Sequence, residues 1–182
     1  MHHIAYIGLG SNLENPVSQL QRAFADLEGL PDTRLVARSS LYRSAPLGCP
    51  DHSDMSSQSD MSSQSDFQSQ PDFVNAVAKI ATSLSPQALL QALLHIEHQH
   101  GRQRTFRNAP RTLDMDVLLY DDMQLHEQGL TIPHPQMHLR AFVLQPLLEI
   151  AQDVSIPGVG QAQRSLQSCQ DQVLERLPHD GL

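Results

Sequence analysis

The stretch 110–120, read as PRTLDMDVLLY, constrains the fold most, because it joins a strand pattern to a pair of acidic residues. Most of it is apolar, β-branched or aromatic, which favours a β-strand. Side chains alternate along a strand, so one face is expected to carry Asp114, Asp116, Leu118 and Tyr120. The two carboxylates would then stand roughly 6 to 7 Å apart at the backbone. Two negative charges this close repel each other, and a bound Mg²⁺ ion would offset the repulsion.

A cluster of arginines directly precedes this strand. Four of them fall within ten residues, against 12 Lys plus Arg in the whole chain: Arg102, Arg104, Arg107 and Arg111. Guanidinium groups bind phosphoryl oxygens, and carboxylates bind the cation that bridges those oxygens. The combination favours a phosphate–metal site over the simpler alternative, an exposed edge strand with two solvated aspartates.

Length and charge narrow the class of protein. The 182 residues suit one domain, 1–182, with a core of its own. The net charge of −8 argues against nucleic acid or an anionic membrane as the main partner. Cys49 and Cys169 are too few for a disulfide scaffold and lack metal-ligand spacing. Because no signal peptide or membrane-spanning run is present, we expect a cytoplasmic protein that acts as a monomer on small molecules.

The order of expected elements favours an α+β fold. Two helices, 16–29 and 86–101, each begin with a proline directly after a capping residue, Asn15 or Ser85. Strand patterns occupy 4–8, 33–44, 73–80 and the residues from 113 onward. This is the βαββαβ order of a ferredoxin-like core, a mainly antiparallel sheet with helices packed on it.

A C-terminal extension follows this core. Range 121–130 has the composition of a turn region or hairpin, and 132–135 that of a stiff extended segment, because a residue before proline avoids the helical region. Range 137–150 predicts a helix kinked by Pro146, and 164–177 predicts a terminal helix.

A polar repeat interrupts the pattern before the third strand. The residues 53–58 (SDMSSQ) recur letter for letter at 59–64, and a third copy begins at 65. Two polar copies cannot bury a core, which excludes a solenoid. We expect 49–70 to be a mobile inserted loop that the fold tolerates.

Five segments together carry a resemblance to a known family. They are AYIGLGSN at 5–12, SLYRSAPLG at 40–48, PDFVNA at 71–76, PRTLDMD at 110–116 and IPHP at 132–135. In this order they resemble the 6-hydroxymethyl-dihydropterin pyrophosphokinases of folate biosynthesis. The resemblance implies a ferredoxin-like fold and transfer of the terminal pyrophosphoryl group of ATP to the hydroxymethyl group of the reduced pterin, with release of AMP.

The resemblance also implies residues for the nucleotide and the metal. Asp114 and Asp116 would bind two Mg²⁺ ions, and with Arg102 and Arg111 they are the catalytic candidates. The implied ATP site consists of Glu97, Arg102, Arg104, Arg111, Thr131, His134 and Arg140. Without the resemblance, Glu97 is equally well explained as a helix-end partner of Arg102.

For the pterin, the resemblance implies a second set of residues. Phe73 and Phe142 correspond to two aromatics that sandwich the flat ring. Asn75 can offer a donor and an acceptor to the amide-like edge of the pterin. Pocket contacts through backbone groups are expected from Ser44, Ala45 and Leu47. Asn108 stands where the family often has Trp, which predicts weaker closure of the arginine loop over the site.

Three alternatives remain open at this level. A different Mg²⁺-dependent phosphoryl or nucleotidyl transferase would release ADP or pyrophosphate instead of AMP. A non-catalytic ferredoxin-like module that binds a ligand is disfavoured, because a sensor does not need paired metal ligands. His95, His98 and His100 suggest a zinc site, but no Asp or Cys completes the spacing, and solvated histidines at a helix end are favoured.

Overall fold

The computed structural model describes residues 1–46, 71–101 and 112–178. Its first elements are β1 (His3–Ser11), α1 (Pro16–Glu28), β2 (Thr33–Arg38), β3 (Tyr42–Ser44), β4 (Phe73–Thr82), α2 (Pro86–Gln99) and β5 (Asp114–Tyr120). They are followed by β6 (Leu125–Glu127), β7 (Leu130–Ile132), the 3₁₀ turn η1 (Met137–Leu139), α3 (Ala141–Ile150), β8 (Ser155–Ile156), β9 (Gly160–Gln161), α4 (Ala162–Gln167) and β10 (Leu174–Arg176).

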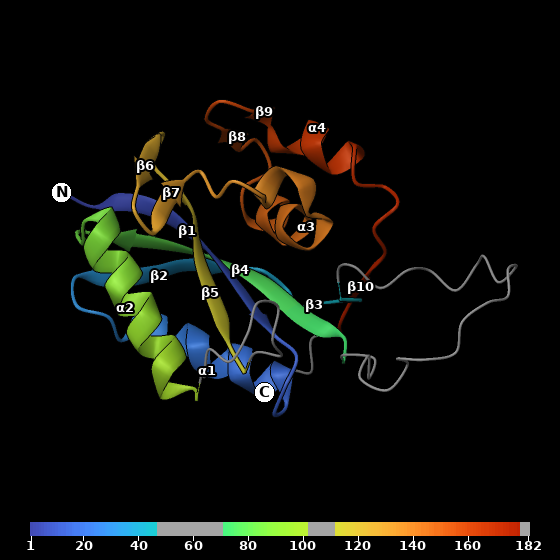
Figure 1. The fold of residues 1–182 in the computed structure, drawn as a ribbon, viewed down its shortest axis with the longest axis horizontal. Coiled ribbons are helices and arrows are strands. Elements are labelled where there is room, and N and C mark those ends of the chain that lie inside the picture. The colour runs from blue at the N-terminus through green and yellow to red at the C-terminus, as the bar shows by residue number, and fades with distance from the viewer. Residues whose placement is uncertain (47–70, 102–111, 179–182) are drawn as a thin grey trace, which may run out of the picture.

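A six-stranded sheet forms the centre of the described chain (Figure 1). β4 pairs with β1 on one side and with both β2 and β3 on the other. β5 extends the sheet beyond β1, and β10 extends it beyond β3. All of these pairings are antiparallel. This order confirms the predicted ferredoxin-like α+β fold, with β2 and β3 together in the place of its second strand.

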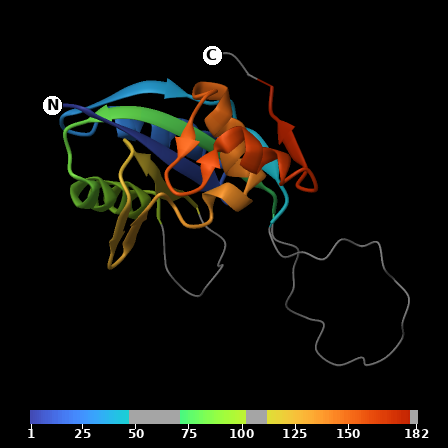
Figure 2. The same cartoon turned by 90° about the horizontal axis from the view of Figure 1, so that it is seen from above.

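Helices lie on both faces of the sheet (Figures 1 and 2), and each face has its own hydrophobic core. Helices α1 and α2 cover one face, where their buried side chains meet those of the sheet: Leu20, Phe24, Leu27, Leu89 and Leu93. Helix α3 covers the other face with Leu144 and Leu147, which pack against Val77 and Leu118. Helices therefore pack on both faces of the sheet.

The local signals for the first two helices are confirmed. The Ser85 hydroxyl accepts a hydrogen bond from the Ala88 N–H at 3.2 Å, and the Asn15 side chain accepts one from the Ser18 N–H at 3.4 Å. Proline follows each cap, where its missing N–H is not needed. The predicted hairpin after β5 is also present, as β6 and β7.

The predicted strand 33–44 is wrong as one element, because the structure divides it into β2 and β3. At the break, the Ser39 hydroxyl accepts a hydrogen bond from the Val77 N–H, and the Ser39 N–H donates to the Val77 carbonyl, both at 2.9 Å. The serine side chain thus replaces a backbone acceptor of the ladder. The Ser40 N–H turns away from the sheet and donates to Glu149 of α3.

The predicted terminal helix 164–177 is also wrong over most of its length. Helix α4 ends at Gln167, and the chain turns into β10, which pairs with β3. The Leu177 N–H then donates to the Leu41 carbonyl at 2.9 Å. The free edge of β3 offers backbone partners that local helical periodicity does not reveal. Upstream, the predicted helix 137–150 is a 3₁₀ turn followed by α3, which contains Pro146.

A bulge in β5 changes which residues share a face. Between Asp116 and Tyr120 the pairing with β1 shifts by one residue at Leu118. An extra residue inverts the alternation of side chains beyond it. Asp114, Asp116 and Leu118 share one face as predicted, but Tyr120 does not: it packs in the core of α1 and α2.

In the ranges that the structure describes, no helix is long and apolar enough to cross a membrane.

Candidate active site

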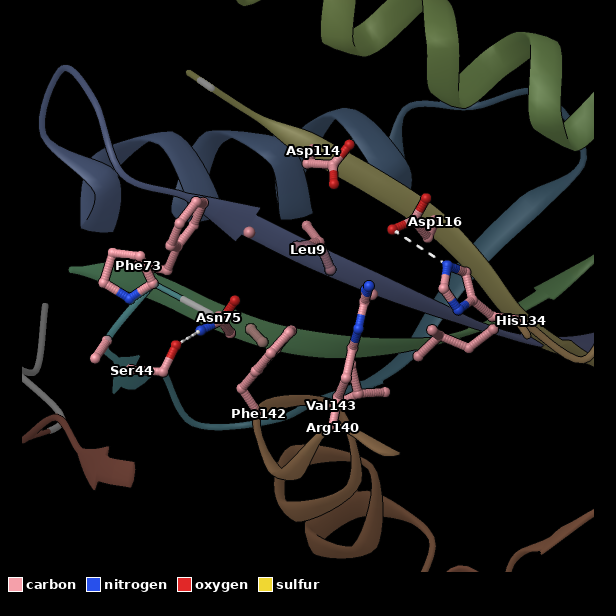
Figure 3. Close-up of a pocket in the computed structure, with 16 residues that line it drawn as sticks. Leu9, Ser44, Phe73, Asn75, Asp114, Asp116, His134, Arg140, Phe142 and Val143 are labelled. Atoms are coloured by element: carbon pink, nitrogen blue, oxygen red, sulfur yellow. Dashed lines mark hydrogen bonds and ion pairs between the residues drawn. The ribbon is translucent and has the colours of Figure 1, made fainter. Parts of the chain in front are cut away.

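A cavity of about 380 Å³ lies on the α3 side of the sheet, where β1, β3, β4 and β5 meet the N-terminus of α3 (Figure 3). It brings together predicted site residues from segments far apart in the sequence. Those that line it are Ser44, Ala45, Phe73, Asn75, Asp114, Asp116, His134, Arg140 and Phe142.

Two glycines of β1 form part of its wall and were not predicted as site residues. A Cβ atom on Gly8 would lie 3.2 Å from Leu118, and one on Gly10 would lie 3.2 Å from the Asn75 Oδ1 atom. Both contacts are shorter than ordinary van der Waals distances, so larger residues would displace these side chains. The signal was available in the sequence as Gly-x-Gly at the end of a strand, which indicates close approach of a neighbour on one face.

The carboxylates of Asp114 and Asp116 line the cavity side by side on β5 (Figure 3). In the sheet they pair with Gly10 and Gly8, so no β1 side chain stands between them and the cavity. Among the described residues, β5 is an edge strand, which agrees with one part of the alternative interpretation, an exposed edge strand with two solvated aspartates. The two aspartates nevertheless both face the cavity, in which further polar side chains lie close to them.

His134 lies at the same end of the cavity. Its Nε2 atom is 4.0 Å from Asp116 Oδ2, and its Nδ1 atom accepts a hydrogen bond from the Gln136 N–H at 3.1 Å. The neutral ring therefore carries its proton on Nε2, the atom that faces Asp116. Burial, and then the charge of Arg140, lower the pKa of His134, which keeps the ring neutral and able to donate one hydrogen bond into the cavity.

Glu97 of α2 supports the acidic pair from the opposite face of the sheet. Its side chain is buried, and Oε1 accepts a hydrogen bond from the Met115 N–H at 2.7 Å. This N–H lies between Asp114 and Asp116 on β5, which is an edge strand of the sheet in the part of the chain that the structure describes. Glu97 is not among the residues that line the cavity.

The other end of the cavity is aromatic and amide-like. Phe73 of β4 and Phe142 of α3 both line it, with Asn75 and Ser44 on the sheet below (Figure 3). The Asn75 Nδ2 atom donates to the Ser44 hydroxyl at 2.8 Å, which fixes the orientation of the amide. The Arg140 guanidinium carbon lies 5.7 Å from the centre of the Phe142 ring, so the aromatic end adjoins the cationic one.

Some predicted residues are not brought to the cavity. Thr131 lies on β7 and is not among the lining residues. Four others lie outside the described residues, together with Asn108 and the insert 49–70: Leu47, Arg102, Arg104 and Arg111.

The histidines at the end of α2 do not form a metal site. Within 1–46, 71–101 and 112–178, no group of three or more His, Cys, Asp or Glu side chains is placed to hold a metal ion. The expectation that these histidines are solvated is wrong for His100, which is buried and bonded to Gln19 at 2.6 Å and to Asp26 at 2.7 Å. His100 instead joins α2 to α1.

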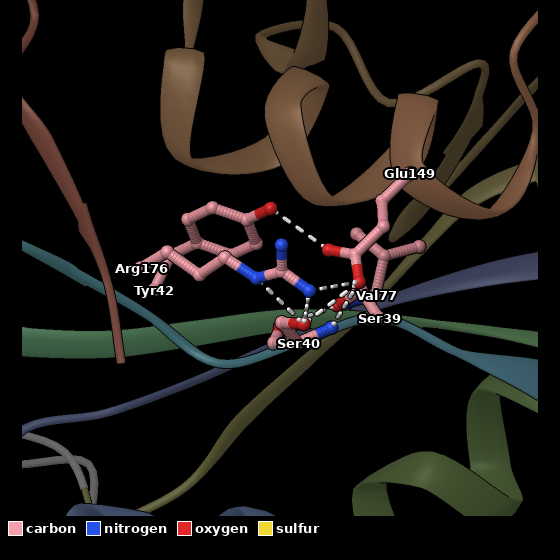
Figure 4. Close-up of polar contacts among 6 residues, drawn as sticks. All are labelled: Ser39, Ser40, Tyr42, Val77, Glu149 and Arg176. Carbon is pink, nitrogen blue, oxygen red and sulfur yellow. Dashed lines mark hydrogen bonds and ion pairs between the residues drawn. The ribbon is translucent and has the colours of Figure 1, made fainter. Parts of the chain in front are cut away.

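A separate polar network joins β3 and the residue Ser40 before it to α3 and β10 (Figure 4). Glu149 of α3 accepts hydrogen bonds from the Ser40 N–H at 3.0 Å, the Ser40 hydroxyl at 2.7 Å and the Tyr42 hydroxyl at 2.8 Å. Arg176 of β10 donates to the Ser40 hydroxyl at 2.8 Å. Burial and the hydrogen bond to Glu149 raise the pKa of Tyr42 to about 12. The network fixes β3, the strand whose last residue, Ser44, lines the cavity.

The fold and this cavity define a ferredoxin-like α+β protein with a candidate ligand site on one face of its sheet. A family model described as 7,8-dihydro-6-hydroxymethylpterin-pyrophosphokinase matches residues 6–152, and the chain belongs to this family. The 2-amino-4-hydroxy-6-hydroxymethyldihydropteridine pyrophosphokinase of Haemophilus influenzae is 48% identical over 154 residues, 85% of each chain. The protein of the same name from Pseudomonas aeruginosa is 43% identical and covers 95% of this chain and 96% of its own.

Solved structures agree on the fold. A crystal structure of an HPPK-DHPS in complex with substrates matches with a TM-score of 0.67 at 12% identity, over 92% of this chain. The wild-type HPPK-DHPS of Plasmodium falciparum with pteroate matches with a TM-score of 0.67 at 13% identity. The present chain spans 43% and 44% of those two chains, so these matches concern one part of larger proteins.

Proposed function

We propose that this chain carries out the reaction for which its family is named. It transfers pyrophosphate from ATP to the hydroxymethyl group of 6-hydroxymethyl-7,8-dihydropterin and releases AMP, a step of folate biosynthesis. The hydroxymethyl oxygen bonds to the β-phosphorus, the bond from that phosphorus to the oxygen it shares with the α-phosphorus breaks, and the hydroxyl proton passes to solvent. The observation that carries the proposal is that one cavity holds a carboxylate pair at one end and an aromatic pair at the other.

The carboxylate pair suits Mg²⁺, with two ions as the proposed number. Mg²⁺ commonly uses one or two carboxylates and completes its shell with substrate phosphates and water, so two protein ligands suffice. Asp114 and Asp116 would hold the ions, whose chemistry is to neutralise phosphate charge and to activate the attacking hydroxyl. Binding and orientation of the two substrates are assigned to other side chains of the cavity and its surroundings.

His134 and Arg140 are proposed to bind the ATP phosphates beside the carboxylate pair. Both line the cavity, and they offer a neutral N–H donor and a permanent cation. Arg102, Arg104 and Arg111, which lie outside the described residues, are proposed to add guanidinium groups to the triphosphate. Such donors stabilise the charge that moves to the leaving AMP. Glu97 acts in this proposal by holding the backbone of β5, and Thr131 acts at the edge of the nucleotide site.

The reduced pterin is proposed to lie between Phe73 and Phe142, with its amide-like edge toward Asn75. Each ring contact typically adds about 0.5–1.5 kcal/mol beyond the area it buries. The Ser44 hydroxyl fixes the Asn75 amide so that its donor and acceptor need not reorient when the ligand binds. Ala45 and Leu47 would complete the pocket through backbone groups.

A product assay tests the proposed reaction. The full chain is mixed with Mg²⁺, ATP and the reduced pterin, and the nucleotide product is separated by chromatography. Release of AMP that requires the pterin supports the proposal. Release of ADP or pyrophosphate would identify a different transferase, and ligand binding without any product would identify a binding module.

We also propose that the enzyme is cytoplasmic and monomeric. Sedimentation of the active enzyme as a single chain agrees with this, and activity that appears only in a dimer contradicts it.

A further inference from the structure

One side-chain amide holds the backbone on both sides of Arg140. The Gln172 Oε1 atom accepts a hydrogen bond from the Ala141 N–H at 2.9 Å, and the Gln172 Nε2 atom donates to the Leu139 carbonyl at 2.8 Å. These two backbone groups belong to the residues directly before and after Arg140. Gln172 itself follows α4, more than thirty residues further along the chain.

The helix that begins at this point lacks a cap of its own. Arg140 occupies the N-cap position of α3 in an extended conformation, with φ −124° and ψ 107°, and its side chain makes no capping hydrogen bond. The first N–H groups of a helix need acceptors from outside the helix. Gln172, from a distant part of the chain, provides the acceptor for the Ala141 N–H, the first of these groups.

Gln172 is held in place by its own surroundings. Its N–H donates to the Cys169 carbonyl at 3.0 Å, and Cys169 is buried in the core on the α3 side of the sheet. The Cys169 thiol in turn contacts the His138 carbonyl at 3.9 Å. Beyond Gln172 the chain enters β10, which is paired with β3. The backbone of Gln172 is therefore fixed by the core before it in the chain and by the sheet after it.

The position of Arg140 depends on the two hydrogen bonds from Gln172 more than the positions of the residues after it do. Ala141, Val143 and Leu144 are buried and fix the body of α3, and with it Phe142. Arg140 lies before the first turn, where the path of the backbone decides whether its guanidinium group enters the cavity. A small displacement of a binding group is enough to weaken its contact strongly.

We propose that Gln172 is a positioning residue for the nucleotide, acting through Arg140. The proposal rests on the assignment of Arg140 to the ATP phosphates. Gln172 is not among the residues that line the cavity, and it lies beyond the residues 6–152 that match the family model. Its effect is specific for the nucleotide: the pterin site, held by Phe73 and the body of α3, does not need it.

The test measures ligand binding to five variants of the full chain. Gln172→Met keeps the length of the side chain and removes both hydrogen bonds, and Gln172→Ala removes the side chain. Gln170→Ala, an exposed residue of the same type in the same turn, is the control. Arg140→Ala and the double variant Arg140→Ala with Gln172→Met complete a cycle. The nucleotide probe is α,β-methylene-ATP with Mg²⁺, which resists cleavage between the α and β phosphorus atoms, and the second probe is the reduced pterin.

The expected result is that Gln172→Met and Gln172→Ala weaken binding of the nucleotide probe about tenfold and change pterin binding less than twofold. Gln170→Ala leaves both unchanged. In the Arg140→Ala background, Gln172→Met has no further effect on the nucleotide, because the group it positions is absent.

Each other outcome contradicts the proposal in its own way. Additive losses in the double variant, or equal losses for both ligands, would make Gln172 a general structural residue. Unfolding of both Gln172 variants, measured by thermal melting, would do the same. If Arg140→Ala itself binds the nucleotide normally, the assignment of Arg140 fails and this proposal with it. If Arg140→Ala weakens binding and Gln172→Met does not, only the role of Gln172 is wrong.

Discussion

The buried carboxylate of Glu97 accepts a hydrogen bond from the Met115 N–H at 2.7 Å, at the point on β5 between the two cavity aspartates. Helix α2 on one face of the sheet thereby fixes the backbone whose side chains line the site on the other face. The carboxylate is thus part of the support of the acidic pair, although its sequence position suggested a nucleotide contact.

Replacing Glu97 tests this support. Glu97→Ala leaves the Met115 N–H buried without its acceptor, and we expect the free energy of unfolding to fall by about 1–3 kcal/mol together with a loss of turnover. Glu97→Gln retains an acceptor oxygen and should lose less than half as much. Urea unfolding and AMP release measure the two effects. A Glu97→Ala variant of normal stability that binds ATP weakly would instead favour direct contact with the nucleotide.

His134 predicts a dependence of stability on pH. Its pKa is lowered below the ordinary value of 6.5 in the folded protein, by burial and then by Arg140. The unfolded chain therefore takes up this proton at a higher pH than the folded chain does. The free energy of unfolding should fall as the pH is lowered from 6.5 toward the folded pKa.

The matched variants for this effect are His134→Gln and His126→Gln. The first removes the titration and should flatten the stability curve in that pH window, whereas the second changes an exposed histidine of the hairpin. Urea midpoints measured from about pH 7.5 to about pH 5 give both curves. Identical curves for His134→Gln and the unchanged protein would show that His134 is not the group that titrates.

The polar network around Glu149 predicts that truncation of this side chain lowers the free energy of unfolding. Glu149→Ala removes the acceptor of Ser40 and Tyr42, and we expect a loss of about 2–3 kcal/mol, since hydrogen bonds to a charged group are the stronger kind. Glu175→Ala is the control: it breaks an exposed ion pair with Arg43 at 3.0 Å and should cost less than about 1 kcal/mol. Equal losses for the two variants would contradict the role given to the network.

The polar insert predicts tolerance to deletion. Ser44 and Phe73, on either side of the insert, are paired directly in the sheet, so their register does not depend on the residues between them. Deletion of 53–64 should leave the rate of AMP release within a few-fold and the free energy of unfolding within about 1 kcal/mol. Abolished activity in a folded deletion variant would assign the repeat a part in the site.

The fold could be predicted where local chemistry decides it. Asn15 and Ser85, each followed by proline, mark the starts of two helices, and alternation placed Asp114 and Asp116 on one face. Prediction failed where a distant residue supplies the partner. The Ser39 hydroxyl interrupts the long strand by taking a place in the ladder of β4, which no local pattern reveals.

The candidate site divides in the same way. The residues within recognisable motifs, such as Asn75 and His134, were predicted and do line the cavity. Gly8 and Gly10 were not predicted: the Gly-x-Gly pattern indicates that a neighbour approaches closely, but it does not say which one. Tyr120 was placed on the wrong face because a bulge is a property of two paired strands, and Gln172 was missed because its role exists only after the C-terminal segment has folded back onto α3.

The central claim is that the carboxylates of Asp114 and Asp116 hold the divalent ions that fix ATP for transfer. The most direct measurement is the rate of pterin-dependent AMP release by Asp114→Ala as a function of Mg²⁺ concentration, with Asp122→Asn, an exposed residue after β5, as control. We predict that Asp114→Ala loses about three or more powers of ten in rate, with stability retained, and that the control keeps its rate. An Asp114→Ala variant that turns over at the unchanged rate with the same Mg²⁺ dependence would contradict the account.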